Sequence, residues 1–254
     1  MNPIHAWKKR QERRRLERWP RYVPTTTVFR GNPFAVVDAC TFLAGSDEIF
    51  GERIYEFQTS KPAPRILDCG ANIGLSVLYF KTIHPGARVV AFEPDPAIFR
   101  VLEANVASFK LRDVELRQAA VWTENGTIEF KPEGGFSGRI LPGATGTVGV
   151  PSVRLRDYLD DPVDFLKIDI EGAEMDVLSD CADRLDGVER MFIEYHAECG
   201  QPQRLDEMLA IVRRAGFFYQ IHEAYVARKP FLERPPMMGM DLQLNLFCFR
   251  EDAS

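Results

Sequence analysis

Acidic side chains and one histidine follow short apolar stretches at several points of this 254-residue sequence. Asp68 ends R-I-L-D, Glu93 ends V-V-A-F-E, and Asp169 and Glu171 follow F-L-K-I. His196 ends the stretch M-F-I-E-Y-H. Carboxylates accept hydrogen bonds from ligand hydroxyls, and histidine is the commonest general base in enzymes. The pattern predicts a site that binds a polar ligand and takes up a proton.

The stretch from residue 65 to residue 80, R-I-L-D-C-G-A-N-I-G-L-S-V-L-Y-F, contains the elements that would position Asp68. Ile66 and Leu67 suit a buried strand, Gly70 and Gly74 allow a tight turn, and the apolar residues that follow recur at helical spacing. Open α/β sheets bind nucleotides in the crevice at the carboxyl ends of their parallel strands. We therefore expect a nucleotide-like ligand at this turn.

The spacing of the glycines indicates which kind of nucleotide-like ligand the turn binds. Dinucleotide-binding folds carry G-x-G-x-x-G, which places a pyrophosphate on a helix N-terminus. This chain has D-C-G-A-N-I-G instead. The pattern D-x-G-x-x-x-G resembles the first motif of methyltransferases that use S-adenosylmethionine (SAM), which carries a sulfonium and an amino-acid head and no phosphate. A tight turn without any ligand is the alternative.

A second acidic position follows at Glu93, which ends R-V-V-A-F-E and precedes Pro94, 25 residues after Asp68. An acid at the end of the second strand of such a fold accepts hydrogen bonds from ribose hydroxyls. We expect Glu93 to bind the ribose of the cofactor. The helix that follows should begin with Asp95 as its N-cap, and the residues from Val114 to Val121 should form a third strand.

The stretch D-F-L-K-I-D-I-E-G-A-E, from residue 164 to residue 174, places Lys167 and Asp169 on one face of an apolar strand. Burying two charges is costly unless they pair or line a site, so a purely structural pair is the alternative to a functional role. The acidic turn has no [N/D]-P-P-[Y/F] sequence, which usually accompanies methylation of a planar amino group. The stretch therefore favours a hydroxyl acceptor.

Period 2 along the strand M-F-I-E-Y puts Glu194 and His196 on one face. We predict that His196 takes the proton of the acceptor hydroxyl, and that Asp169 or Glu171 orients the acceptor or stabilises the imidazolium. A structural histidine at a strand end is the alternative. No metal ion is expected, because a spaced set of Asp, Asp and Asn ligands is not recognisable, although Asp169, Glu171, Glu194 and His196 offer ligand atoms.

Composition agrees with a single large α/β core preceded by two short segments. We expect a basic N-terminal helix over residues 1–22, an approach or lid segment over 23–64, and the catalytic domain over 65–254. The five cysteines are scattered without a C-x-x-C pair, which excludes both a disulfide framework and a zinc site. The apolar runs are too short for a membrane span, and no signal-peptide core is seen, so the chain is expected in the cytoplasm.

Charge is uneven, because residues 1–22 contain eight Lys or Arg and two Glu, a net charge of +6, while the whole chain carries −5. The remainder therefore carries −5 − 6 = −11, which argues against a broad nucleic-acid groove. The basic helix could lie on the inner membrane surface, or it could dock on its own domain or on a sister subunit in a homo-oligomer.

Together, I-L-D-C-G-A-N-I-G-L-S, A-F-E-P-D-P, D-F-L-K-I-D-I-E-G-A-E and I-E-Y-H resemble the FkbM-type SAM-dependent methyltransferases. The resemblance covers residues 65 to 216. It implies a class I, Rossmann-like α/β fold with a seven-stranded mixed sheet and helices on both faces. It also implies O-methylation, most often of sugars in surface glycans or of natural products. A SAM-fold adaptor without catalysis is a further alternative.

The cofactor residues expected from the motifs and the resemblance share positions at the ends of the first four strands. They are Asp68, Gly70, Asn72, Gly74, Ser76, Glu93, Pro94, Gln118, Ala119, Ala120 and Asp169. The proline- and methionine-rich stretch from Arg228 to Met240 lies where a cap over the acceptor could form. The acceptor is expected to be a hydroxyl of a glycan or of a small molecule, and its identity is not carried over from the resemblance.

Overall fold

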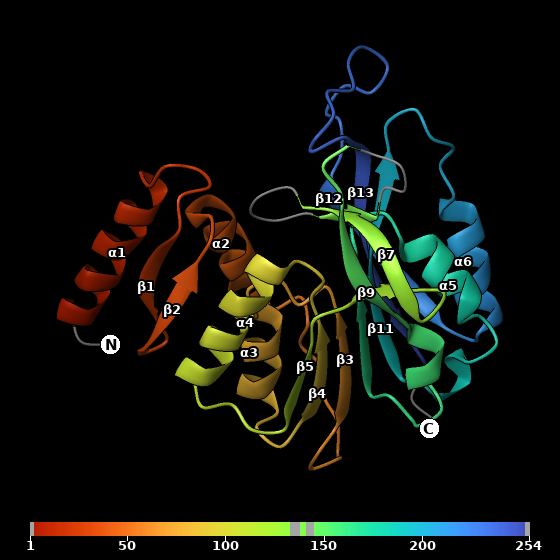
Figure 1. Ribbon diagram of the computed structural model, residues 1–254, viewed down its shortest axis with the longest axis horizontal. Helices are drawn as coiled ribbons and strands as arrows, with labels where there is room; N and C mark the ends of the chain where they lie inside the picture. Colours follow the sequence, from red (N-terminus) through yellow and green to blue (C-terminus); the bar gives the residue numbers. More distant parts are fainter. Residues whose placement is uncertain (1–2, 133–137, 141–144, 252–254) are drawn as a thin grey trace.

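The computed structural model describes residues 3–132, 138–140 and 145–251, with side chains from residue 7 onward. Its centre is a seven-stranded sheet of order β12-β13-β11-β10-β3-β4-β5 (Figure 1). β13 runs antiparallel to both of its neighbours, and the pairs from β11 to β5 are parallel. The expected seven-stranded mixed sheet is confirmed.

The first half of the sheet contains the predicted strand, turn and helix. Its elements are β3 (Arg65–Cys69), α3 (Leu75–Ile83), β4 (Arg88–Phe92), α4 (Pro96–Ser108) and β5 (Val114–Arg117). Asp95 caps α4 as expected, because its side chain accepts hydrogen bonds from the backbone N–H groups of Ala97 and Ile98. Helices α3 and α4 cover one face of the sheet (Figure 1).

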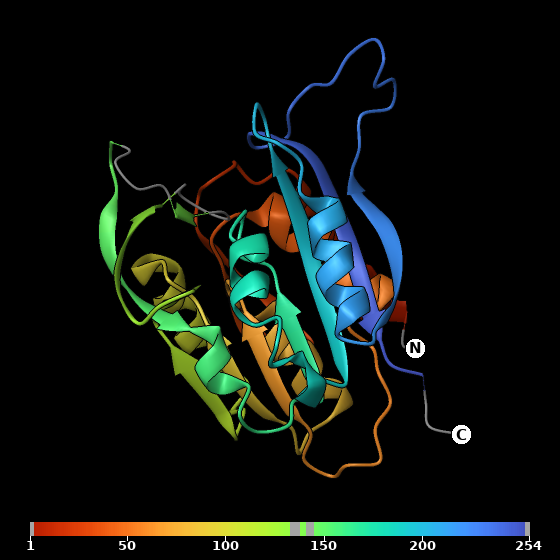
Figure 2. The ribbon, with the colours of Figure 1, turned by 90° about the vertical axis from the view of Figure 1, so that its right-hand side faces the viewer.

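The second half continues on the other side of β3. Its elements are β10 (Phe165–Ile168), α5 (Glu174–Asp180), β11 (Arg190–Glu198), α6 (Leu205–Arg214), β12 (Phe218–Tyr225) and β13 (Met240–Phe249), with 3₁₀ turns at Leu155–Tyr158 and Leu185–Gly187. Helices α5 and α6 pack on the face opposite α3 and α4. The loop between β12 and β13 projects beyond the body of the molecule (Figure 2).

The predicted third strand over Val114–Val121 is wrong, because the chain turns at Gln118 and the two parts join different sheets. β5 ends at Arg117, and a tight bond from the Ala119 N–H to the Arg117 carbonyl redirects the backbone. The next strand opens a separate four-stranded sheet of order β6-β9-β7-β8. Its strands are β6 (Ala120–Trp122), β7 (Gly126–Lys131), β8 (Arg139–Ile140) and β9 (Val148–Arg154).

The N-terminal segment packs beside α3 and α4 (Figure 1). It consists of α1 (Pro3–Glu17), β1 (Thr25–Phe29), β2 (Asn32–Val36), α2 (Ala39–Ser46) and a π-helical turn, Asp47–Glu52. Asn105 of α4 binds this segment to the glycine turn, since its side chain donates to the carbonyls of Ala35 and Ile73 and accepts from the Ala35 N–H. The division at residues 22 and 64 stays a prediction.

Helix α1 docks on its own chain through a few residues. Leu16 is buried in the same apolar core as Phe34 of β2, and Arg13 makes paired hydrogen bonds of 2.7 Å to Asp47. Its remaining basic side chains between residues 8 and 14 are exposed. No helix within the described residues is both long and apolar enough to cross a membrane.

Candidate active site

A cavity of about 550 Å³ opens at the carboxyl ends of β3, β4, β10 and β11. One side is formed by the glycine turn after β3 and by the end of β4, and the other by the acidic turn after β10 and the end of β11. The N-terminal segment and the base of the β12–β13 loop supply further walls. Residues far apart in the sequence thus meet at one edge of the sheet, as parallel topology requires.

The glycine turn lies directly against the acidic turn. Gly70 has a φ of +89°, and a Cβ atom placed there would lie 1.8 Å from the carbonyl oxygen of Asp169. Only glycine allows both this backbone conformation and this close approach. Asn72 continues the turn at a φ of 48°, and its side-chain oxygen accepts a hydrogen bond from the Ile73 N–H. Gly70 and Asn72 both line the cavity, as predicted.

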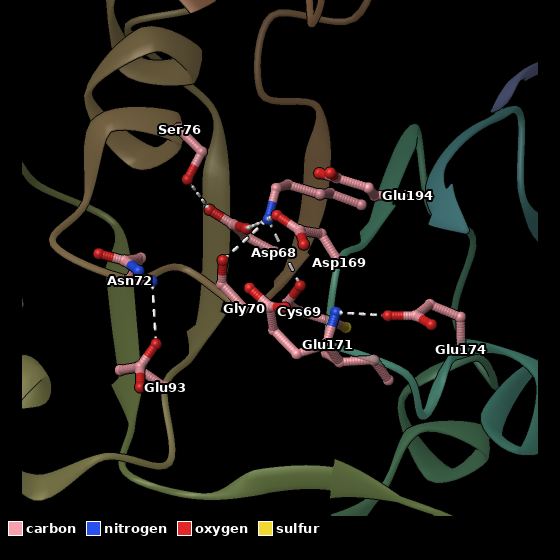
Figure 3. A network of polar contacts seen from close by, with 12 residues as sticks. Asp68, Cys69, Gly70, Asn72, Ser76, Glu93, Asp169, Glu171, Glu174 and Glu194 are labelled. Carbon is pink, nitrogen blue, oxygen red and sulfur yellow. Dashed lines mark hydrogen bonds and ion pairs between the residues drawn. The ribbon is translucent and has the colours of Figure 1, made fainter. Parts of the chain in front are cut away.

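Glu93 lies at the cavity wall with its carboxylate held by the backbone. Its Oε2 accepts from the Asn72 N–H at 3.0 Å, and its Oε1 accepts from the Asp95 N–H at 2.9 Å (Figure 3). Burial raises its pKa to about 8, even though these two hydrogen bonds favour the ionised form. Each oxygen keeps accepting capacity for a ligand hydroxyl.

Asp68 does not line the cavity, in contrast to the expectation. The β3–β10 register pairs Asp68 with Lys167, and the carboxylate is fully buried below the turn. Its Oδ2 accepts from Ser76 Oγ at 2.5 Å, and its Oδ1 lies 3.4 Å from Lys167 Nζ (Figure 3). Asp68 therefore fixes the end of β3 against α3 and β10, and a direct contact with the cofactor is not supported.

The remaining predicted cofactor residues divide into two groups. Ser76, Pro94, Ala119 and Ala120 line the cavity. Gln118 is exposed outside it, because the chain turns there, and Gly74 serves packing. Gly74 has a φ of +91° at the start of α3, and a Cβ atom there would lie 2.8 Å from Leu102 Cδ1.

Lys167 is a buried cation at the centre of the site. Its Nζ lies 3.0 Å from Asp169 Oδ2 and donates to the Gly70 carbonyl at 2.8 Å. Burial lowers its pKa, but Asp169 and Asp68 outweigh this and raise the pKa well above its usual value. The structural pair that the sequence left open thus exists, and one of its partners, Asp169, also lines the cavity.

Asp169, Glu171 and His196 are brought together, as predicted. The imidazole is almost fully buried, and its Nε2 lies 3.7 Å from Glu171 Oε2 and 3.7 Å from Glu194 Oε1. Burial raises the pKa of Glu171 to about 7 and that of Glu194 to about 8. Burial lowers the pKa of His196, but the surrounding carboxylates, Glu174 first, raise it to about 10.

Glu174 is a site residue that the sequence analysis missed. Its buried carboxylate accepts from the N–H groups of Ile170 and Gly172 and from His196 Nδ1, each at 3.0 Å. It thereby holds both the acidic turn and the imidazole, and Glu171 adopts an uncommon φ of 56° within that turn. Local sequence carried no signal for this role, because the bond to His196 joins residues of two different elements.

The N-terminal segment closes one end of the cavity. Phe42, Glu48 and Tyr55 line it, and Glu48 accepts a 3.0 Å hydrogen bond from Asn245 of β13. Phe42 and Tyr55 also belong to the apolar core. These aromatic side chains therefore belong to the core and to the cavity wall at once. Met237 and Met238 of the β12–β13 loop line the opposite end.

The cavity fits SAM better than a phosphate-bearing nucleotide. Carboxylates outnumber cations among the described residues that line it, and the cation Lys167 is already paired with Asp68 and Asp169. Such a surface attracts a sulfonium and an ammonium group and repels phosphates. Glu93 supplies the acceptor that two ribose hydroxyls need.

Comparison with known proteins agrees with this geometry. Residues 68–219 match the family described as the methyltransferase FkbM domain. Methyltransferase 1 of Beauveria bassiana is 30% identical over 158 residues, which are 52% of this chain and 64% of that protein. The 2-O-methyltransferase NoeI of Sinorhizobium fredii is 28% identical over 158 residues, 53% of this chain and 64% of that protein.

A third relative, the 31-O-demethyl-FK506 methyltransferase FkbM of Streptomyces tacrolimicus, is 28% identical over 210 residues, 67% of this chain and 79% of that protein. Two solved structures share the fold. Methyltransferase FkbM of Methylobacillus flagellatus aligns with a TM-score of 0.54 at 16% identity, over 83% of this chain and 52% of that one. TYW2 of M. jannaschii, in complex with AdoMet, aligns with a TM-score of 0.51 at 13% identity, over 91% and 87%.

Proposed function

The chain belongs to the FkbM methyltransferase family, and from that premise we propose that it transfers the methyl group of SAM to a hydroxyl group of a sugar in a surface glycan. One observation carries the proposal. A single cavity joins the wall that suits the cofactor, with Gly70, Asn72 and Glu93, to the cluster of Asp169, Glu171 and His196. The chain spans 64% of the Beauveria bassiana relative, so the activity of the whole protein is part of the proposal.

The cofactor is proposed to lie along the glycine turn. Glu93 accepts hydrogen bonds from both ribose hydroxyls, and Pro94, Ala119 and Ala120 form the apolar side of the adenine site. The acidic turn faces the charged end of the cofactor, because Asp169 contacts Gly70 through its backbone and lines the cavity with its side chain. SAM, when bound, supplies a methyl group on a positively charged sulfur, which is an intrinsically good donor.

The chain's own contribution is to align the acceptor oxygen and to take its proton. A sugar hydroxyl is a weak nucleophile at neutral pH, so the proton must leave as the new bond forms. Asp169, Glu171, Glu194 and His196, which we call the acidic cluster, face the cavity from the ends of β10 and β11. We propose that a member of the acidic cluster accepts the proton of the acceptor hydroxyl.

The pKa values refine the part of His196. With a pKa near 10, the imidazole carries a proton at neutral pH when only carboxylates surround it. In that state the ring stabilises negative charge, and a carboxylate such as Glu171, with a pKa near 7, is better suited to receive the proton. His196 serves as the base only where something else neutralises the carboxylates around it.

The acceptor class has a second candidate. The FK506-directed relative supports an alternative in which a hydroxyl of a small natural product is methylated. Residues at the base of the β12–β13 loop line the cavity, and we propose that this loop caps either acceptor. The family assignment does not support the alternative of a SAM-fold adaptor without catalysis. Residence in the cytoplasm and contact of α1 with an anionic membrane surface stay proposals.

Two measurements test the proposed function in sequence. Calorimetry with SAM should give one binding site per chain, and slow turnover of SAM without acceptor should be detectable. Mass spectrometry of surface sugars from cells with and without the gene should then reveal a methyl ether that depends on the gene. If SAM binds but the surface sugars are identical, the glycan acceptor is excluded and small hydroxylated metabolites become the candidates.

A further inference from the structure

Three side chains of the acidic cluster offer metal-ligand atoms at short mutual distances. A carboxylate oxygen of Asp169, a carboxylate oxygen of Glu171 and a ring nitrogen of His196 all lie within 4.8 Å of one another. The two carboxylates come from the turn after β10, and the imidazole comes from β11. Oxygen atoms with one imidazole form a donor set that Mg²⁺ and Mn²⁺ accept.

The orientation of His196 is an independent indication of a ligand. Its side chain is only 2% exposed, and Nδ1 bonds to Glu174, whose carboxylate also accepts from two backbone N–H groups. In the neutral ring Nδ1 therefore carries the hydrogen, and Nε2 is the position that can bind a cation. Nε2 makes no hydrogen bond, because Glu171 and Glu194 lie 3.7 Å away. Metal-binding histidines are typically held in this way by a carboxylate behind the ring.

The charge balance of the cluster also points to a cation. Lys167 is paired with Asp68 and Asp169, while Glu171 and Glu194 both face the imidazole, and Arg139 also favours the ionised form of Glu171. Buried like charges repel strongly, and either protons or a cation must compensate them. A divalent ion would do so and would release His196 from its proton.

We infer that Asp169, Glu171 and Nε2 of His196 bind one divalent cation, Mg²⁺ or Mn²⁺, with open positions toward the cavity. This replaces the expectation that no metal takes part. The cation's role rests on the proposed function, since a hydroxyl bound to it becomes more acidic. The O–H proton then passes to Glu194 while the oxygen forms its bond to the methyl carbon and the bond from that carbon to sulfur breaks.

Manganese binding to the whole chain tests the inference without any acceptor. After treatment with a chelator, the protein is titrated with Mn²⁺, and the free ion is measured by electron paramagnetic resonance. One site per chain is expected. Asp169→Asn and His196→Gln should each weaken Mn²⁺ binding by at least about 100-fold, more than the 10–100-fold typical for supporting residues. Glu103→Gln, on the exposed side of α4, is the matched control and should bind as the wild type does.

Two further readouts separate the possible failures. Both variants should keep the circular dichroism spectrum of the wild type, which shows that they are folded, and Mn²⁺ should raise the unfolding temperature of the wild type but not of either variant. If the wild type binds no Mn²⁺, or if both variants bind it unchanged, the inference is overturned whatever the methyl-transfer result. If Mn²⁺ binds as expected but no methyl group is transferred, the site stands and the proposed function fails.

Discussion

Replacing Glu93 by alanine should weaken SAM binding through the ribose. The carboxylate is buried and already accepts from the N–H groups of Asn72 and Asp95 at 3.0 and 2.9 Å. In the complex we propose, its remaining lone pairs accept from two ribose hydroxyls. The alanine variant removes these acceptors, and the hydroxyls lose their partners in a site shielded from water.

A lower limit for the magnitude follows from one of the two lost hydrogen bonds. Bonds to a charged acceptor contribute about 1.5–3 kcal/mol in proteins. A loss of that size raises the Kd of SAM by roughly 10–150-fold, at about 1.4 kcal/mol for each factor of ten. Isothermal calorimetry at fixed pH measures it directly. Ala119→Gly, on the proposed adenine side of the same cavity, is a control that leaves the ribose contact intact.

The pKa of Glu93 adds a second, independent signature. With a pKa of about 8 in the free protein, the carboxyl is largely protonated at pH 7. Ribose hydroxyls donate to the ionised form, so binding must expel that proton, and affinity falls as the pH drops below 8. Linkage predicts roughly tenfold tighter binding at pH 9 than at pH 7. Glu93→Gln cannot ionise, and the ratio of its Kd to that of the wild type isolates this contribution from the titration of SAM itself.

Two results would refute this reasoning. An unchanged Kd in Glu93→Ala would remove Glu93 from the cofactor site. A wild type and a Glu93→Gln variant with the same pH dependence would show that the carboxylate does not ionise on binding.

Three further predictions concern the rest of the site. His196→Ala should lower turnover by about 10²–10⁴-fold while the Kd of SAM stays within twofold, since the change removes the imidazole of the acidic cluster and no cofactor contact; a weaker Kd with unchanged single-turnover rates would contradict this. Lys167→Met should destabilise the fold by about 3–5 kcal/mol in urea unfolding, because Asp68 is left buried without its cation; full stability would show that the pair is dispensable. Gly70→Ala should cost more than about 3 kcal/mol, from the positive φ and the clash with the Asp169 carbonyl, and soluble protein with wild-type stability would contradict that packing.

Local sequence signals predicted the sheet and most of its helices. The strand, glycine turn and helix after Arg65 are predicted from residues that are neighbours in the sequence. The N-cap at Asp95 is also predicted locally, because it bonds only to the N–H groups of Ala97 and Ile98. These elements form as predicted because helix or strand propensity, apolar periodicity and capping all favour the same local structure.

Contacts between residues far apart in the sequence could not be predicted. Asp68 lies next to the last residue of its strand, and the register with Lys167 places its side chain in the core. Glu174 became visible as a site residue only when β11 brought His196 to it. The second sheet forms because β9 returns to pair with β6 and β7, a choice that no local pattern near Gln118 specifies.

The most direct measurement of the central claim is the position of a transferred methyl group. The purified protein is incubated with SAM labelled with carbon-13 in the methyl group and with surface polysaccharide from cells that lack the gene, and carbon-13 NMR identifies the atom that carries the label. We predict a labelled methyl ether on a sugar oxygen, and its loss with His196→Gln. Label on nitrogen or carbon, or none on the polysaccharide despite SAM binding, would contradict sugar O-methylation.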